Sequence, residues 1–346
     1  MSDPRPKTVV LHQFTGIGDL VWHIPYFKAV AEQSQGGQVS VIAQPSTLAR
    51  QLIGHEPWVA EIIDHDHRPR RSERRKGRHA GLRGMWRFAQ ELRARRFDRI
   101  VLFSGRVSRG LLAWMTGIPV RMGYGYRWLQ RIFLNCPPYI ARYEGEGVPV
   151  YFEASALAVA HGFVSRPIVP RIELPAHAPA PVTAVLQDLP RPVRVLAVGT
   201  SEPHKQWGRD NFVALARQLL DEGGSVLVLG GRSESELATS IVQALPPAQQ
   251  ERAKPVTHLT VLESAALLAQ SDICIGNDTG MISVSAACGC PTVVVLGKRP
   301  TLAHDPLIHC VAGTALNLIR PQDVRAAARE SASTRKTLLT NGPITV

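Results

Sequence analysis

The chain has 346 residues, of which 45% are hydrophobic. A chain of this length and composition exceeds what one hydrophobic core usually supports, so we expect two domains. The five cysteines are odd in number and form no C-x-x-C pair, which argues against a disulfide framework and a zinc site and favours the reducing cytosol. The formal net charge is +12, and it is unevenly distributed: residues 1–170 hold 24 basic and 13 acidic side chains, and residues 171–346 hold 16 and 15. An anionic partner should therefore meet the first half.

Along the first half, short apolar runs alternate with longer amphipathic segments. This rhythm is typical of parallel strands connected by helices. Strands are expected at residues 7–14, 37–44, 59–64 and 98–105. Helices are expected from about residue 19, and at residues 46–54, 80–97, 106–117 and 153–163. No apolar run approaches the roughly 18 to 20 residues that a transmembrane helix needs, and the first run is too short for a signal peptide.

A proline-rich stretch follows, and then the same rhythm starts again. Residues 171–192 are predicted to be a linker. Strands are then expected at residues 194–201, 224–231, 272–278 and 291–297. Helices are expected at residues 208–223, 233–245, 261–271 and 280–290. The prediction is an α/β protein with two Rossmann-like, doubly wound domains, residues 1–170 and 193–346, that face a central cleft, with a last helix able to pack back on the N-terminal domain.

The first strand is followed by Gly16-x-Gly18-Asp19, which begins like a dinucleotide-binding turn. That fingerprint needs a small residue at position 21 and an acid at the end of the second strand, where this chain has Val21 and Gln44. A carboxylate at a helix start would also repel a pyrophosphate, although the helix dipole stabilises it. Asp19 is therefore expected to cap the helix, to face a cleft that binds something other than a nucleotide, or to do both.

Two strand ends in the second half carry groups suited to phosphate. Thr200 and Ser201 end one strand, and Lys205 follows them with a positive charge. The segment Asp278-Thr279-Gly280 lies between another strand and a helix, whose N-terminal amides can bind an anion. Each could be an ordinary strand-to-helix turn, but together they predict a phosphate site on one sheet.

Three separated motifs, in this order, resemble glycosyltransferase family 9, the ADP-heptose:lipopolysaccharide heptosyltransferases and their relatives. They are Gly-x-Gly-Asp at residues 16–19, Thr-Ser-x-x-x-Lys-x-Trp at 200–207 and the segment NDTG...SAACGCPTVVVLG at 277–297. The resemblance implies a GT-B architecture and inverting transfer without a metal or cofactor. It also implies an ADP-heptose donor and an anionic acceptor of the lipopolysaccharide inner core, handled at the cytoplasmic face of the inner membrane.

The resemblance assigns roles to residues of this chain. Asp19 would be the general base, with Thr200, Ser201 and Lys205 contacting the diphosphate. Further donor contacts would be Glu234, Asp278, Thr279 and Gly280, although Glu234 reads equally well as a solvated residue at a helix start. Acceptor contacts are expected from Gly18, Arg70, Arg71, Arg74, Arg75 and Arg121. This chain has Ser283 where family members commonly carry a histidine, which leaves the donor sugar open.

The segment of residues 67–79 holds seven Arg or Lys side chains and one Glu. This basic tract is either a solvated loop or the capture site for a phosphorylated acceptor at the membrane surface, where each basic residue contributes roughly 1 kcal/mol. The tract lacks interleaved aromatic residues, which argues against nucleic acid. Asp64-x-Asp66 just before it has the spacing of a metal-binding pair, but the neighbouring cations would oppose a divalent ion.

Three alternatives to the heptosyltransferase prediction stay open. A relative that uses another nucleotide sugar and one that acts on a different acceptor would share all three motifs. A nucleotide-binding relative that has lost transfer would share them as well.

Overall fold

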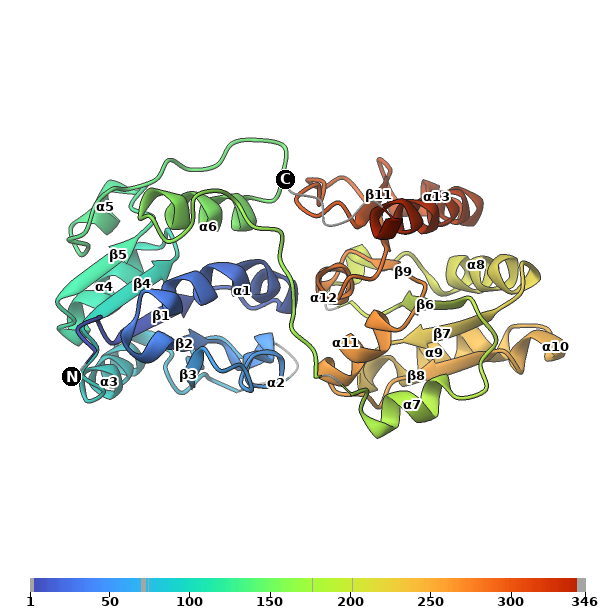
Figure 1. Cartoon of the computed structure of the whole chain (residues 1–346), viewed down its shortest axis with the longest axis horizontal. Helices are drawn as coiled ribbons and strands as arrows, with labels where there is room; N and C mark the ends of the chain where they lie inside the picture. Colours follow the sequence, from blue (N-terminus) through green and yellow to red (C-terminus); the bar gives the residue numbers. More distant parts are fainter. Residues whose placement is uncertain (1–2, 70–72, 74, 176, 201, 341–346) are drawn as a thin grey trace. The chain divides into compact units, whose positions relative to one another are not determined.

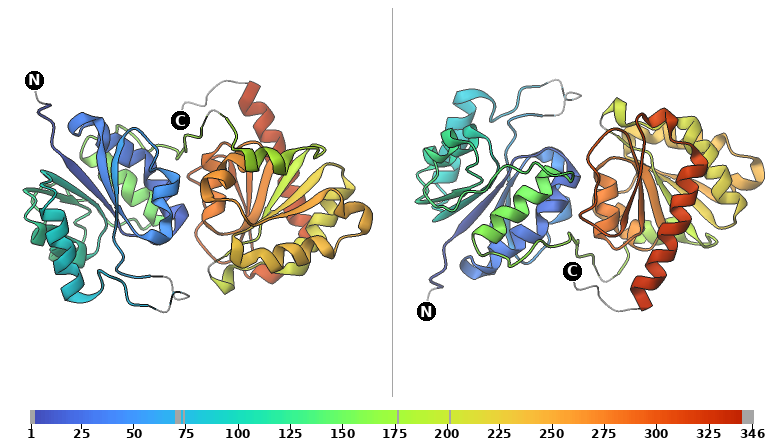
Figure 2. Two further views of the ribbon diagram at one scale, coloured as in Figure 1. Left: turned by 90° about the horizontal axis from the view of Figure 1, so that it is seen from below. Right: turned by 90° about the horizontal axis from the view of Figure 1, so that it is seen from above.

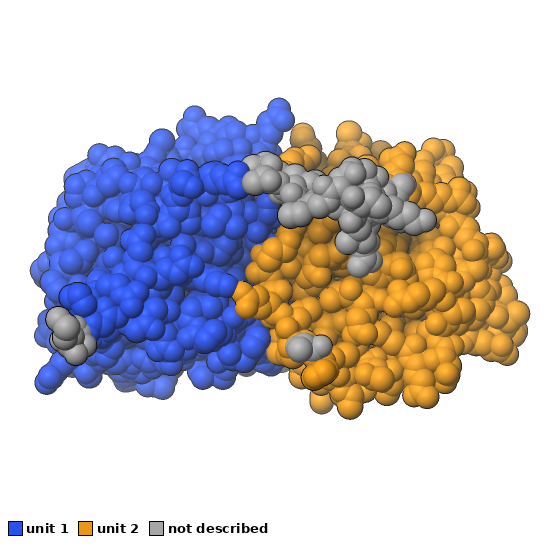
Figure 3. Space-filling model, in the orientation of Figure 1, with its two compact units in different colours: residues 1–170 blue, residues 171–346 orange. Residues whose placement is uncertain are grey.

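The computed structural model describes residues 3–69, 73, 75–175, 177–200 and 202–340, with side chains up to residue 331. The chain divides into two compact units, Met1–Pro170 (unit 1) and Arg171–Val346 (unit 2), which are coloured separately in Figure 3. Each unit is described by itself.

Unit 1 is built on a five-stranded parallel sheet in the order β3-β2-β1-β4-β5 (Figure 1). The strands are β1 (Thr8–His12), β2 (Val39–Ala43), β3 (Val59–Asp64), β4 (Arg99–Phe103) and β5 (Val120–Gly123). All residues of β1, β2 and β4 are buried, as expected for short apolar runs covered by helices on both faces of a parallel sheet.

The helices of unit 1 lie in two layers. They are α1 (Ile17–Glu32), α2 (Ala49–Leu52), α3 (Gly81–Arg93), α4 (Val107–Thr116), α5 (Trp128–Arg131) and α6 (Pro149–Ala160). On one side of the sheet α1 packs against α6, and on the other α3 packs against α4, as the two views of Figure 2 show. Phe88 and Leu92 of α3 and Leu112 of α4 bury their side chains against the sheet.

Unit 2 has a six-stranded parallel sheet in the order β11-β10-β9-β6-β7-β8. The strands are β6 (Val193–Ala197), β7 (Ser225–Leu229), β8 (Ala253–Val256), β9 (Ile273–Asn277), β10 (Thr292–Leu296) and β11 (Ile308–Ala312). The helices are α7 (Ala180–Leu186), α8 (Arg209–Asp221), α9 (Ser235–Gln243), α10 (Pro247–Gln250), α11 (Val261–Ala269), α12 (Gly280–Ala287) and α13 (Pro321–Thr340). The final helix α13 packs on α8 and on β9, β10 and β11.

The described residues of the proline-rich segment 171–192 make specific contacts with unit 2. The segment contains α7, which packs against α11, and the Ile172 N–H donates a hydrogen bond to the Ala287 carbonyl (3.0 Å). Arg171 forms an ion pair with Asp305 (2.7 Å). The segment is therefore part of unit 2 and not a separate linker.

Candidate active site

The candidate residues of both units follow the strands at which each sheet reverses its winding. In unit 1 the chain runs from β1 outward to β2 and β3 and then returns to β4, on the other side of β1; unit 2 repeats this around β6 and β9. Ligands of such sheets bind beyond the carboxyl ends of these two strands, because the loops diverge there. Asp19 follows β1, Lys205 follows β6 and Asp278 follows β9.

Lys205 is the centre of the unit 2 site. Its largely buried ammonium lies 2.5 Å from Glu202 Oε1 and 3.8 Å from Asp278 Oδ2. The hydrogen bond from Lys205 is the main cause that lowers the pKa of the Glu202 carboxyl. A phosphate that reaches Lys205 must compete with these two carboxylates for one ammonium group.

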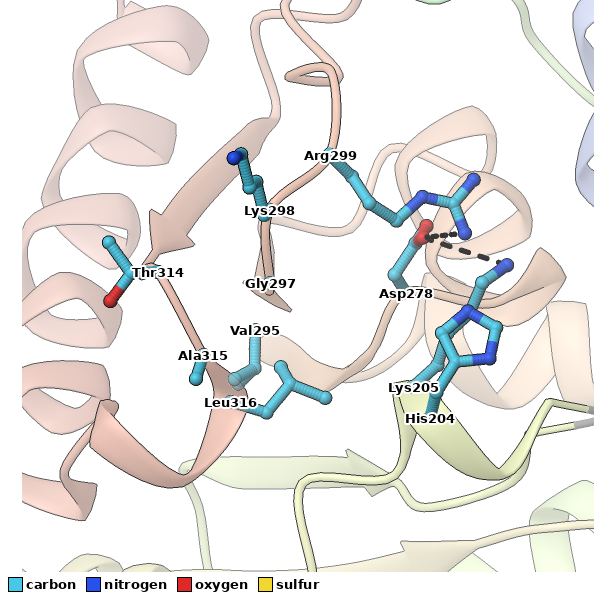
Figure 4. Close-up of a pocket in the computed structure, with 10 residues that line it drawn as sticks. All are labelled: His204, Lys205, Asp278, Val295, Gly297, Lys298, Arg299, Thr314, Ala315 and Leu316. Carbon is cyan, nitrogen blue, oxygen red and sulfur yellow. Dashed lines mark ion pairs between the residues drawn. The ribbon is translucent and has the colours of Figure 1, made fainter.

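Asp278 has a second cationic neighbour, which sequence reasoning missed. Arg299 Nη1 lies 3.1 Å from Asp278 Oδ2 (Figure 4). The only signal for Arg299 in the sequence was its place shortly after the apolar run of β10. Next to Asp278, Thr279 is the N-cap of α12, and its side chain makes no capping hydrogen bond among the described residues. The first-turn amides of α12 thus add to the positive potential of Lys205 and Arg299.

A cavity of about 490 Å³ opens beside these groups (Figure 4). Its lining residues are His204, Lys205, Asp278, Val295, Gly297, Lys298, Arg299, Thr314, Ala315 and Leu316. The basic side chains come from the loops after β6 and β10, whereas Val295 and Leu316 supply apolar surface. Small-molecule sites commonly have this size and this mixture of apolar lining with a few polar groups.

Asn277, the last residue of β9, holds the two strand ends together. Its side-chain oxygen accepts a hydrogen bond from the Trp207 N–H (3.0 Å), and its amide donates to the Val198 carbonyl (2.9 Å). The Trp207 indole donates to the Ile319 carbonyl (3.0 Å) and is buried. Asn277 and Trp207 are therefore framework residues that fix the loop carrying Lys205.

The other predicted donor contacts have local partners. The Thr200 hydroxyl donates to the Glu202 carbonyl and accepts from the Glu202 N–H, both at 3.1 Å. The Glu234 carboxylate accepts from the Gly231 N–H (2.8 Å) and the Ser233 hydroxyl (2.7 Å), the arrangement of a residue at a helix start. Ser283 is buried in α12, and Ser201 lies outside the described residues.

In unit 1, Asp19 is the third residue of α1 and not its cap. The helix begins at Ile17, and its N-cap residue is Gly16, so the capping alternative is wrong in that form. A Cβ atom built on Gly16 would lie 2.7 Å from Asp19 Oδ2, so the half-buried carboxylate folds back over this glycine. Gly18, an expected acceptor contact, is buried. An acid in the first turn is stabilised as a carboxylate by the helix dipole.

Two buried histidines lie beneath Asp19. The Nδ1 atom of His23 lies 2.6 Å from the Asp19 carbonyl oxygen, to which it donates. The His12 and His23 rings meet edge to face with their centroids 4.8 Å apart, and Phe27 and Phe103 pack around them. Burial lowers the pKa of His12 well below its usual value and that of His23 to about 4, so both are neutral at pH 7. They support the turn that presents Asp19.

A polar cluster that sequence reasoning missed follows the neighbouring strands of unit 1. Gln44, after β2, has its amide 3.5 Å from the Gln13 carbonyl oxygen and 3.4 Å from His67 Nε2. His67, after β3, contacts the guanidinium of Arg109, a buried residue in the first turn of α4. Burial is the main cause that lowers the pKa of Arg109 to about 10, so it stays charged at pH 7. A buried cation whose described partner is an imidazole attracts an anionic ligand.

The structure describes two of the five arginines that were expected to contact the acceptor. Arg75 is paired with Asp66 and Glu73, and Arg121 donates to the carbonyls of Phe133 (2.8 Å) and Ile118 (2.7 Å). These contacts favour structural roles for both side chains. Arg70, Arg71 and Arg74 lie outside the described residues.

Both carboxylates of the Asp64-x-Asp66 pair form ion pairs with arginines, in the position that a bound metal ion would take. Asp64 is paired with Arg50 (3.2 Å), and Asp66 is paired with Arg75. In the described part of the chain, no group of three His, Cys, Asp or Glu side chains is placed to hold a metal ion.

Most of the chain matches a known protein family. The model of glycosyltransferase family 9 (heptosyltransferase) matches residues 85–326. This chain belongs to glycosyltransferase family 9. Lipopolysaccharide heptosyltransferase 2 of Escherichia coli is 32% identical over 108 residues, which cover 31% of this chain and 31% of that protein. The aligned segment thus spans less than a third of that relative.

Solved structures of this family share the fold of almost the entire chain. The E. coli ADP-heptose lipopolysaccharide heptosyltransferase II matches with a TM-score of 0.72 and 19% identity, covering 95% of this chain and 99% of that chain. The E. coli heptosyltransferase WaaC with ADP matches with a TM-score of 0.71 and 19% identity, covering 96% and 100%. These matches confirm the GT-B architecture of two parallel α/β units.

Proposed function

We propose that this family 9 protein transfers a heptose from ADP-heptose to an anionic acceptor of the lipopolysaccharide inner core. The observation that carries the proposal is the position of Lys205 between Glu202 and Asp278, beside Arg299 and the N-terminus of α12. The two cations and the N-terminal amides of the helix suit the negative charge of a diphosphate. Relatives bearing the heptosyltransferase name, and one relative solved with ADP, support the choice of donor.

Unit 2 binds the donor in this proposal. The diphosphate takes the place of Glu202 and Asp278 at the Lys205 ammonium, with Thr200, Ser201, Thr279 and Gly280 as further contacts. Asp278 stays next to the site because it is paired with Arg299. Glu234 follows β7, the strand beside β6. No metal takes part, because fixed cations and helix amides can stabilise the charge that develops on the leaving ADP.

Unit 1 supplies the base and binds the acceptor. An acceptor hydroxyl oxygen attacks the anomeric carbon, and the bond from that carbon to the phosphate oxygen breaks. The electron pair leaves with ADP, Asp19 takes the hydroxyl proton, and the anomeric configuration is inverted. Arg109 with His67, and the basic tract of residues 67–79, attract the negative groups of the acceptor. The protein works as a peripheral protein at the cytoplasmic face of the inner membrane.

The test is a matrix of donors and acceptors. The protein is incubated with ADP-heptose, other ADP-sugars and UDP-sugars, each with truncated lipopolysaccharides. Release of ADP or UDP and the mass of the product are measured. Heptose addition from ADP-heptose is the expected result. Turnover with another sugar alone would overturn the donor assignment, for which Ser283 gives a specific reason. ADP binding without turnover on every acceptor would instead indicate a relative that has lost catalysis.

A further inference from the structure

Large apolar side chains are exposed mainly on one part of unit 1. Leu82 and Trp86 of α3 are 78% and 59% exposed, Trp114 of α4 is 56% exposed, and Trp128 of α5 is 69% exposed. With Leu129 and Ile132, these residues form what we call the tryptophan face. Among the described residues, three other large apolar side chains are exposed, namely Val159 (39%), Ile168 (36%) and Leu318 (63%).

The helices that carry the tryptophan face are neighbours. α3 packs on α4, and α4 packs on α5 (Figures 1 and 2). Their inward residues, such as Phe88 and Leu112, already fill the core of unit 1. The tryptophans are thus not needed to complete this core, and several large apolar side chains exposed on neighbouring helices are typical of an interaction site.

The charge around the tryptophan face is strongly positive. Residues 81–133 contain eleven arginines and two acids, and nine of these arginines are not buried, since Arg99 and Arg109 are. One of the acids, Glu91, is paired with Arg78. Arg83 and Arg87 are exposed on α3 beside Trp86, and Arg127 is exposed directly before Trp128. Exposed arginines therefore accompany two of the three tryptophans of this face.

We propose that the tryptophan face docks unit 1 on an anionic lipid bilayer, a proposal that rests on the proposed function at a membrane surface. Tryptophan rings settle at the headgroup level of a bilayer, and arginines bind lipid phosphates. The helices would lie in the interface plane. Among the described residues, no helix is long and apolar enough to cross a membrane.

The basic tract ends at α3. Its last residue, His79, has its ring 4.5 Å from the Phe88 ring of this helix. Asp66 forms an ion pair with Arg75 and accepts a hydrogen bond from the Arg78 N–H (3.2 Å), two residues of the tract. Docking by α3 would therefore keep Arg78 and His79 close to the headgroups, where an anionic glycolipid presents its charged sugars.

The experiment measures binding of the full chain to vesicles by flotation. Vesicles of phosphatidylethanolamine and phosphatidylglycerol are compared with vesicles of phosphatidylcholine alone. We expect binding to the anionic vesicles, weakened at least about tenfold by Trp86→Ala/Trp114→Ala/Trp128→Ala and by Arg83→Gln/Arg87→Gln/Arg127→Gln. The control Leu318→Ala removes an equally exposed apolar side chain from unit 2 and should bind like the wild type. Thermal melts verify that each variant is folded.

Turnover separates this proposal from the proposed function. The tryptophan variant should keep wild-type turnover on a soluble truncated acceptor and lose turnover on an acceptor embedded in anionic vesicles. A wild type that binds vesicles but transfers no sugar would refute the proposed function and leave the docking surface standing. Wild-type binding by the tryptophan variant would overturn the docking proposal. A tryptophan variant that changes only self-association would also overturn the docking proposal, because the face would then be a protein interface.

Discussion

A Cβ atom on Gly16 would lie 2.7 Å from the Oδ2 atom of Asp19. Side-chain carbons do not approach an oxygen that closely, so the position of this carboxylate depends on the absence of a side chain at residue 16. The placement of the proposed base thus explains why the first motif has a glycine at residue 16.

Gly16→Ala should displace the Asp19 carboxylate without unfolding unit 1. The backbone of Gly16 has φ −86° and ψ 148°, which alanine adopts readily. A catalytic group misplaced by about 1 Å can cost about 10²-fold in rate, so we expect turnover to fall to that extent. ADP affinity and melting temperature should stay close to wild type. Wild-type turnover in this variant would show that the Gly16 contact does not position a catalytic group.

Lys205→Ala should weaken ADP binding, because it removes a charge-assisted contact of about 1.5–3 kcal/mol, or roughly ten- to a hundredfold in affinity. Titration calorimetry measures this directly. Lys254→Ala is the matched control, since Lys254 lies on β8 and donates to the Val185 carbonyl (3.4 Å). Glu202→Gln removes a competing carboxylate and should leave ADP affinity equal or higher. Unchanged affinity in Lys205→Ala would remove this lysine from the site.

Turnover should persist in excess EDTA, because the proposed phosphate partners are Lys205, Arg299 and helix amides. Asp64→Asn and Asp66→Asn should leave the metal response unchanged, since both carboxylates are paired with arginines. The measurement is the initial rate with EDTA and after re-addition of Mg²⁺ or Mn²⁺. A loss of activity that these ions restore would contradict the metal-free mechanism.

Unit 1 should lose stability as the pH falls below neutral. Burial lowers the pKa of His23 from 6.5 in the unfolded chain to about 4, and it lowers that of His12 in the same direction. Between these values the unfolded state binds more protons at His23, so the free energy of unfolding falls by up to about 1.4 kcal/mol for each unit by which the pH falls. His12 acts in the same direction. Urea unfolding at several pH values between about 7 and 5 measures the slope. His23→Gln should flatten it, and an equal slope in this variant would refute the assignment.

The central strands could be predicted from the sequence, whereas most edge strands could not. β1, β2, β4, β6, β7, β9 and β10 are short apolar runs whose residues are all buried, and each was expected. The strands β5, β8 and β11 were missed, and all three lie at a sheet edge. Edge strands keep one side in solvent, and their sequences show it: β5 contains Arg121, and β8 contains Lys254 and Pro255.

The site was predictable only as far as it follows from strand ends. Asp19, Lys205 and Asp278 follow apolar runs, and parallel strands bring such ends to one edge of a sheet. The ion pair of Arg299 with Asp278 and the contact of Arg109 with His67 depend on side-chain packing between distant segments, which leaves no local pattern. A run of positive charge likewise does not reveal that Arg75 is already paired with Asp66.

Asp19→Asn tests the central claim most directly. Asparagine has almost the same shape and can keep a hydrogen bond at the start of α1, but its amide cannot accept a proton. The measurement combines turnover of ADP-heptose with a truncated lipopolysaccharide, ADP affinity and melting temperature on this one variant. The account predicts a fall in turnover of about 10²- to 10⁴-fold, with ADP affinity and melting temperature unchanged. Turnover close to that of the wild type in a folded, ADP-binding variant would contradict it and leave Asp19 with a structural role at the start of its helix.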